Sequence, residues 1–134
     1  MGADKDADSE IDRLVKELHR LLPDAKTYPF VHLFPDAKEH DCHRNVDAFV
    51  AANESYRVAR GWLFFDFRMA ALFGMSPFLR FSAHSLVEDK NGQRFDITPS
   101  RASQQYPFIE HPFGDEDFTD LITKHRMSHL DVEV

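Results

Sequence analysis

The chain has 134 residues, of which 43% are hydrophobic and 29% are charged, a balance typical of one globular domain. Its formal net charge of −7, without a basic run, argues against a nucleic-acid partner, because phosphates are neutralised by clustered Lys and Arg. A single cysteine excludes an intramolecular disulfide, and we find neither a secretory signal nor an apolar stretch of ~18 residues. We therefore expect a cytoplasmic protein with no membrane partner.

The N-terminal part of the chain predicts a helix and a short extended segment. Residues 1–8 are expected to be a disordered lead, and Ser9 is a good helix N-cap. Apolar residues then recur at helical spacing until Pro23 ends the pattern. The aromatic and β-branched residues 28–34, bounded by prolines, indicate a short extended segment or an edge strand.

The middle of the chain predicts a helix followed by two strands. The helix is expected from Asp41, a good N-cap residue, to about Val58. Residues 61–67 are typical of a buried strand, residues 69–77 of a connection, and residues 78–88 of a second strand.

Residues 89–92 form a strong turn signal, so we expect a return strand over residues 93–98. The C-terminal part predicts loops rich in proline and aromatic residues, a short helix over residues 116–124 and a last strand. Together these elements predict a single α+β domain over residues 9–134. Its small antiparallel sheet packs against a central helix that carries the cysteine at its N-terminus.

Cys42 is the first candidate for chemistry. In the first turn of a helix, unpaired backbone N–H groups and the helix dipole favour an anion. The thiolate is the reactive form of cysteine, and helix N-termini lower thiol pKa values. The alternative is that Cys42 is a small buried core residue, which is the usual role of a lone cysteine.

The hairpin turn brings a histidine and a carboxylate together. A type I turn followed by a left-handed glycine places Val87 opposite Phe95 and makes His84 and Asp96 diagonal neighbours. A register shifted by one residue would put aromatic and aliphatic side chains on the histidine face. A carboxylate beside a histidine fixes its tautomer and supports the imidazolium form. Alternatively, His84 is a half-buried structural histidine and Asp96 caps the turn that follows.

The order of these residues resembles that of a known group of enzymes. A Cys at a helix start, a His on a strand and an Asp on the neighbouring strand resemble the papain-like and transglutaminase-like cysteine superfamily. The likeness is carried by residues 41–46, 81–87 and 95–99. The Cys-x-x-Asn-Val start also looks like that of the N-terminal glutamine amidases. The resemblance implies a papain-like core and a Cys42–His84–Asp96 triad that needs no cofactor and acts on a peptide or protein amide.

The resemblance also implies an oxyanion donor near the nucleophile. The backbone N–H of Cys42 is one candidate, and the side chains of His40, His43 and Asn45 are others; the sequence does not choose among them.

Three aromatic positions are further candidates for substrate contact. Trp62 follows a glycine and is more typical of a core residue than of a binding platform. The proline-flanked aromatic loops around Phe108 and His111 are candidates for the walls of a substrate groove.

The sequence leaves two functions open. The first is a thiol-dependent amide hydrolase or acyltransferase, and the second is a noncatalytic peptide-binding or protein-binding domain with a structural cysteine. A metal site is not favoured, because no Cys-x-x-Cys pair occurs and adjacent residues such as Cys42 and His43 usually point apart on a helix. The oligomeric state is not determined by the sequence.

Overall fold

The computed structural model describes the backbone of residues 2–100 and 106–134, and side chains from residue 9 onward within those ranges. The helices are α1 (Gly2–Leu21), α2 (Cys42–Ala52) and α3 (Asp115–Thr123), with short 3-10 helices η1 (Leu22–Asp24) and η2 (Arg68–Phe73). The strands are β1 (Arg57–Phe67), β2 (Phe78–Glu88), β3 (Arg94–Phe95), β4 (Phe108–Glu110) and β5 (His129–Glu133). This composition confirms the predicted α+β class.

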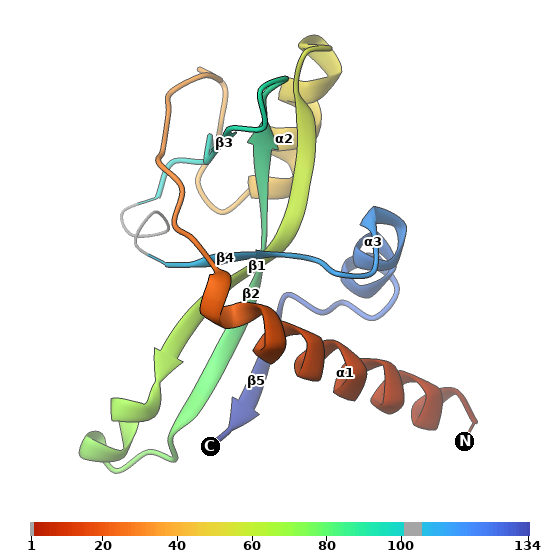
Figure 1. Cartoon of the computed structure of the whole chain (residues 1–134), viewed down its shortest axis with the longest axis vertical. Coiled ribbons are helices and arrows are strands. Elements are labelled where there is room, and N and C mark those ends of the chain that lie inside the picture. Colours follow the sequence, from red (N-terminus) through yellow and green to blue (C-terminus); the bar gives the residue numbers. More distant parts are fainter. Residues whose placement is uncertain (1, 101–105) are drawn as a thin grey trace.

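The sheet is built on a long antiparallel pair, β1 and β2, which forms the twisted ribbon at the centre of Figure 1. β4 lies on the outer side of β1. On the outer side of β2, β5 pairs with residues 78–82 and β3 pairs with residues 87–88. Neither of these strands pairs with residues 83–86, although the N–H of Ala83 donates to the carbonyl of Ser128. No described strand pairs with residues 84–86 on this edge of β2, and we call this segment the β2 gap.

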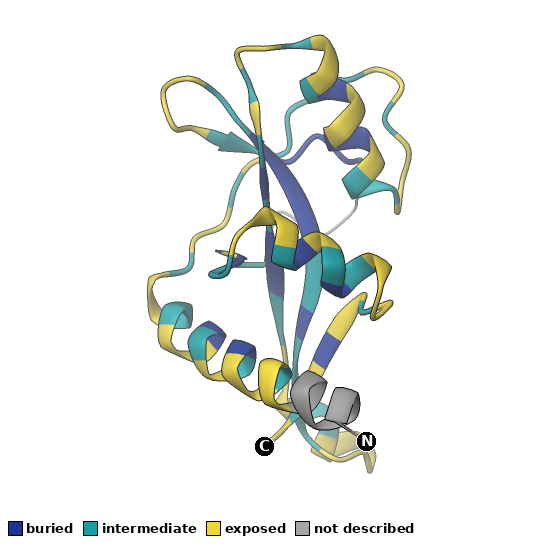
Figure 2. Ribbon diagram, turned by 90° about the vertical axis from the view of Figure 1, so that its right-hand side faces the viewer, coloured by how far each residue is buried: buried dark blue, intermediate teal, exposed yellow. Residues whose placement is uncertain are grey.

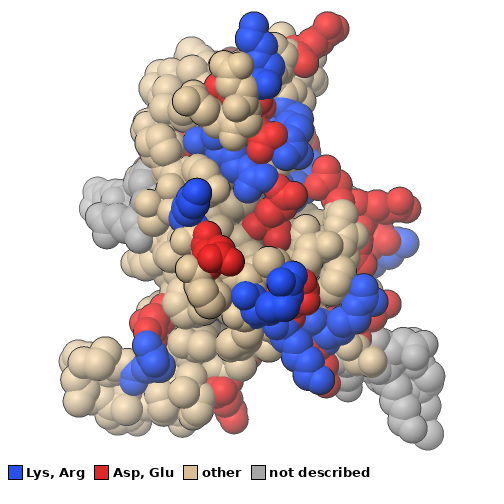
Figure 3. All heavy atoms as spheres, viewed as in Figure 1, with Lys and Arg blue, Asp and Glu red and all other residues tan. Residues whose placement is uncertain are grey.

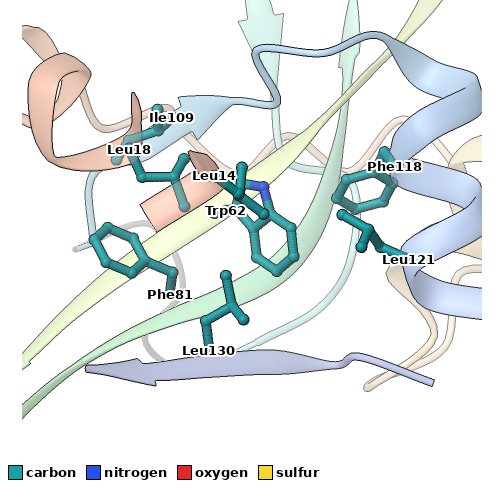
Figure 4. Close-up of a cluster of buried hydrophobic side chains, with 8 residues drawn as sticks. All are labelled: Leu14, Leu18, Trp62, Phe81, Ile109, Phe118, Leu121 and Leu130. Carbon is teal, nitrogen blue, oxygen red and sulfur yellow. The ribbon is translucent and has the colours of Figure 1, made fainter. Parts of the chain in front are cut away.

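One face of the sheet is covered by helices, and its largest hydrophobic cluster lies under α1 and α3. Figure 4 shows Trp62 of β1 in the middle of this cluster, which also draws on β2, β4 and β5. Its buried members are Leu14, Leu18, Trp62, Phe81, Ile109, Phe118, Leu121 and Leu130. Figure 2 shows that each of these two helices has a buried side and an exposed side, as amphipathic helices do.

α2 packs on the same face farther along the strands. Its residues Val46 and Phe49 contact Val87 of β2 and Ile97, and all four are buried. Side chains six residues apart on a strand point to the same face, so Val87 and the Phe81 of the first cluster belong to one continuous apolar surface. This packing fixes where the N-terminus of α2 meets β2.

On the opposite face of the sheet, no helix packs among the residues that the structure describes. A third cluster there is built from Leu63, Leu86 and Phe108, with Phe65 and Tyr106 packed against it. β4 crosses very close to β1 at this point: a Cβ atom at Gly61 would lie 2.1 Å from the carbonyl oxygen of Ile109. Only glycine leaves room for β4 at that distance.

One predicted boundary of each helix in the first half of the chain differs from the structure. α1 begins at Gly2, ahead of the predicted cap at Ser9 and within the segment expected to be disordered. α2 ends at Ala52, not near Val58, because the chain turns at Asn53, whose N–H bonds the carbonyl of Val50. Val58 instead belongs to β1 and pairs with Val87 of β2. The free energy of this strand pairing outweighs the helical preference that the apolar spacing predicted.

The predicted hairpin register is confirmed, but the return strand is shorter than expected. Val87 pairs with Phe95, and the turn glycine, Gly92, has a φ of 82°. β3 ends after Phe95 because the backbone of Asp96 bonds residues 29 and 31, not β2. The segment 28–34 accordingly forms an isolated bridge and no full strand. This early departure of the chain leaves the β2 gap open.

Two elements were not predicted: the short strand β4, and the 3-10 helix η2 in the connection between β1 and β2, which we call the hairpin tip. The flanking prolines of β4 indicated only loops. The tip exposes large apolar side chains, namely Phe67, Met69, Leu72, Phe73 and Met75. In Figure 3 this tip carries little charge, whereas Lys, Arg, Asp and Glu are mixed over the rest of that face.

Among the described residues, no helix combines the length and the apolar character needed to cross a membrane.

Candidate active site

The N-terminus of α2 meets β2 at the β2 gap. Cys42, the first residue of α2, is hydrogen-bonded to His84, and the next residue, His43, is hydrogen-bonded to Ser85 at 2.6 Å. Consecutive residues of a strand point to opposite faces of the sheet. Cys42 and His43 therefore contact adjacent residues of β2 whose side chains point to opposite faces of the sheet. The start of α2 lies beside the edge of β2 at the β2 gap.

Backbone and amide hydrogen bonds hold the helix start in this position. Asp41 occupies the predicted N-cap position, and its carbonyl accepts the first helical bond from Asn45 at 2.9 Å, but its side chain makes no capping bond. The amide of Asn45 donates instead to the carbonyl of Lys38 at 2.8 Å and to Thr98 Oγ1 at 3.1 Å. Asn45 thus ties the helix start to the loop before it and to the segment after β3.

His84 and Asp96 form the pair that the sequence predicted. His84 Nε2 lies 2.8 Å from Asp96 Oδ2, and the N–H of Thr98 donates to Asp96 Oδ1 at 3.0 Å. His84 is 7% exposed and Asp96 is 2% exposed, so the pair is shielded from water. Because Nε2 bonds Asp96, Nδ1 is the ring nitrogen left for Cys42. The imidazole of His84 therefore lies between the sulfur of Cys42 and the carboxylate of Asp96.

This arrangement favours the charged forms of the sulfur and the ring. Burial alone raises the pKa of the Cys42 thiol, but hydrogen bonds from His43 and His84 outweigh it and lower that pKa to about 6. Burial alone lowers the pKa of His84, but the bonds to Asp96 and Cys42 raise it to about 9. Between these two values the site holds a thiolate and an imidazolium, the reactive form of a cysteine nucleophile.

Cys42 and His84 line a cavity of about 730 Å³, within the usual size of small-molecule sites. Its apolar wall is formed by Leu63, Phe65, Pro99, Tyr106 and Ile122. Among the described residues that line it, Arg126 is the only Lys or Arg, and no carboxylate is present. The cavity thus suits a partly apolar ligand that has no positive charge.

The predicted oxyanion candidates occupy different positions. His40 and His43 line the cavity, and His40 takes a left-handed backbone conformation with a φ of 62°. Asn45 is buried, and both protons of its amide are engaged by Lys38 and Thr98, so its role is structural. The N–H of Cys42 belongs to the first helical turn, whose amides have no partner within the helix.

The three aromatic candidates lie away from the cavity surface. Trp62 is in the centre of the core under α1 and α3, and its Nε1 donates to His111 Nδ1 at 3.1 Å. His111 is also buried, and its Nε2 bonds Asp117 Oδ2 at 2.7 Å. Phe108 packs behind Leu63, in the cluster that backs the cavity wall. The interpretation of Trp62 as a core residue is confirmed, whereas Phe108 and His111, which were candidates for the groove walls, serve packing in the fold.

The described part of the chain thus contains two buried histidines that bond an aspartate, and only His84 adjoins Cys42. Since Trp62 donates to Nδ1 of His111, the proton of this ring is on Nε2 and the ring is neutral. Burial lowers the pKa of His111, in contrast to the raised pKa of His84. His111 is therefore a structural histidine, whereas His84 is the histidine that is placed to exchange a proton with Cys42.

Sequence reasoning missed several residues of the site. Ser85 and Thr98, which bond His43 and Asn45, gave no signal beyond their places beside His84 and before a proline. Among the described residues, no cluster of three or more His, Cys, Asp or Glu side chains is arranged to hold a metal ion. Comparison of this chain with protein-family models, with curated proteins and with solved structures gives no match.

Proposed function

We propose that this protein is a thiol-dependent amide hydrolase or acyltransferase in which Cys42, His84 and Asp96 act as nucleophile, base and orienting group. The observation that carries the proposal is the hydrogen-bonded series from Cys42 through His84 to Asp96, placed at a helix N-terminus beside an open cavity. The order of these residues along the chain also supports a papain-like or transglutaminase-like core.

The reaction starts from the thiolate. Cys42 Sγ attacks the carbonyl carbon of a carboxamide and forms a C–S bond, while the carbonyl π electrons move to oxygen. The amides of the first turn of α2, which have no partner within the helix, would favour this negative charge. When the C–N bond breaks, His84 gives its proton to the leaving nitrogen, so the products of this half-reaction are a thioester and a free amine or ammonia.

The second half-reaction regenerates the enzyme. His84, now neutral, takes a proton from water or from an acceptor amine, which attacks the thioester carbon. The C–S bond breaks, Cys42 leaves as a thiolate, and the product is an acid or a new amide. Asp96 keeps His84 in the orientation needed for both transfers, because its carboxylate holds Nε2 in place and stabilises the imidazolium.

The cavity indicates the class of substrate. Its apolar wall and the absence of a carboxylate among its described lining residues favour an uncharged amide over a cationic group. A peptide or protein carboxamide, such as the side chain of an internal glutamine, meets this requirement, whereas an N-terminal glutamine brings an α-ammonium group that no described carboxylate of the lining would pair.

Trapping of the thioester tests the proposal. The protein is incubated with three classes of peptide: one with an N-terminal glutamine, one with an internal glutamine and one without glutamine, in which only the peptide bonds can react. The reaction is then quenched in acid, and the mass of the intact protein is measured by mass spectrometry. We expect an acyl adduct on Cys42 with at least one class, together with release of ammonia or an amine. Cys42→Ala should give neither, with an unchanged circular dichroism spectrum. Turnover by Cys42→Ala would contradict the mechanism, and a folded protein without any adduct would favour a binding domain.

A further inference from the structure

His43 belongs to a second hydrogen-bonded series that ends at the same sulfur. Arg60 on β1 donates from Nη1 to Ser85 Oγ at 2.9 Å, and Ser85 Oγ lies 2.6 Å from His43 Nδ1. Arg60 also forms an ion pair with Asp47, one helical turn after His43 on α2. His43 in turn is hydrogen-bonded to Cys42. Two series, through His84 and through His43, thus converge on Cys42.

The positions of the protons in this second series follow from the chemistry of its donors. A guanidinium only donates, so Ser85 Oγ accepts from Arg60. Ser85 is fully buried, with 0% exposure, and among the described contacts His43 Nδ1 is the acceptor within reach of its hydroxyl proton. A buried hydroxyl proton left without an acceptor is costly, so Ser85 donates to His43 Nδ1. Nδ1 therefore carries no proton, and the ring proton of His43 is on Nε2.

We propose that Ser85, held by Arg60, fixes His43 as the neutral tautomer protonated at Nε2, and that this N–H donates a second hydrogen bond to the sulfur of Cys42. His43 then stabilises the thiolate without exchanging a proton, whereas His84 is the group that transfers protons. This inference assigns a role to a residue of the site and rests on Cys42 being the nucleophile of the proposed function.

The charges around this series agree with a fixed, neutral His43. The cation beside Ser85 is Arg60, and its partner is the carboxylate of Asp47; among the described contacts the partner of His43 Nδ1 is Ser85 Oγ and not a carboxylate. The ring of His43 also packs edge-on against Phe118, with centroids 5.7 Å apart, which limits its rotation. Position, tautomer and orientation of the ring are thereby set by three different elements.

Two substitutions of His43 distinguish the roles of its two ring nitrogens. Glutamine places an amide N–H₂ near the position of Nε2, and asparagine places one near the position of Nδ1. We expect His43→Gln to keep the midpoint of Cys42 alkylation near that of the parent. His43→Asn should raise this midpoint by about one to two pH units, because a hydrogen bond to the thiolate is lost. A midpoint in His43→Asn equal to that of the parent would overturn the proposal.

Nuclear magnetic resonance of the ¹⁵N-histidine-labelled parent tests the tautomer without any substitution. The two-bond ¹H–¹⁵N correlation spectrum distinguishes a ring protonated at Nε2 from one protonated at Nδ1 or at both nitrogens. His43, assigned by loss of its signals in His43→Gln, should be protonated at Nε2 alone at pH 7, and Ser85→Ala should change this pattern. Protonation at Nδ1 in the parent would refute the assigned donor.

Neither experiment needs a substrate, so failure of the proposed function and failure of this inference give different results. A parent that turns over amides while His43→Asn keeps the parent's midpoint contradicts only the role of His43. A parent without amide turnover, but with the Nε2 tautomer and a raised midpoint in His43→Asn, contradicts only the proposed reaction.

Discussion

Replacement of His84 by glutamine is expected to lower amide turnover by about 10²–10⁴-fold, the usual contribution of a general acid–base residue. Glutamine keeps a donor toward Asp96, so the buried carboxylate stays paired and the fold is retained. It has no titratable group, so it neither takes the proton of Cys42 nor protonates the leaving nitrogen. The measurement is kcat and KM of His84→Gln with the amide that acylates the parent.

The pH dependence of the same variant gives a second readout. In the parent, turnover should rise as pH passes about 6, where Cys42 becomes a thiolate, and fall as pH passes about 9, where His84 loses its proton. In His84→Gln the lower limb should move to higher pH, because the thiolate has lost the imidazolium, and the upper limb should disappear. An unshifted profile would show that another group serves as the base.

His111→Gln is the matched control for this substitution. His111 is also buried and also bonds an aspartate, but its partners are Trp62 and Asp117 and it does not contact the cavity. The control should lose stability, because it disturbs a buried hydrogen-bond network, yet keep the parent's pH profile in the folded fraction. A shifted profile in His111→Gln would mean that the effect is not specific to the pair beside Cys42.

Asp96→Asn should reduce turnover by about 10³–10⁴-fold while changing almost no volume. An amide N–H₂ facing Nε2 would turn that nitrogen into an acceptor, which moves the ring proton of His84 to Nδ1. A ring protonated at Nδ1 cannot take the proton of Cys42. The expected result is a low kcat together with a thiol pKa that returns toward the ordinary value of ~8.5.

Asp117→Asn controls for the loss of a carboxylate that bonds a buried histidine, although the Asp117 side chain is itself partly exposed. It changes the same atoms in the second His–Asp pair, and His111 there is already neutral with its proton on Nε2. We expect Asp117→Asn to keep the thiol pKa and kcat of the parent. Equal losses in both asparagine variants would assign the effect of Asp96→Asn to stability alone.

The hairpin was predictable from the sequence because local chemistry determines it. Residues 89–92 dictate the turn, and the apolar alternation on both strands admits one register, which brings His84 to Asp96. The start of α2 at Cys42 was also predicted, from Asp41 as a cap residue and from an apolar helix face, although the side chain of Asp41 makes no capping bond in the fold. Both predictions depend on contacts between residues near one another in the sequence.

The extent of the return strand was not predictable, because a distant segment decides it. Asp96 leaves β2 to bond residues 29–31, which are far away in the sequence and carry no pattern that specifies this contact. The β2 gap, and with it the access of α2 to His84, results from that contact. The turn at Asn53 and the short strand β4 are similarly decided by tertiary packing.

The sequence predicted the carboxylate partner of His84, but it gave no signal that His111 is a second buried histidine with a carboxylate partner. His84 and His111 each lie in an apolar region, and each finds a carboxylate in the fold. What separates them is the partner of the second ring nitrogen, a thiol for His84 and the indole N–H of Trp62 for His111. Such a difference depends on long-range contacts and has no local signature. For the same reason the role of Ser85 beside His43 became visible only in the folded chain.

The central claim is that folding converts Cys42 into a thiolate at neutral pH, and the pH dependence of its alkylation by iodoacetamide measures this directly. The chain has one cysteine, so the reaction reports a single site. We predict a rate that rises with a midpoint near pH 6 in the folded protein. After unfolding in denaturant, the midpoint should lie near the ~8.5 of a free thiol. A folded protein whose midpoint matches that of the unfolded chain, or whose cysteine reacts only after unfolding, would contradict the account.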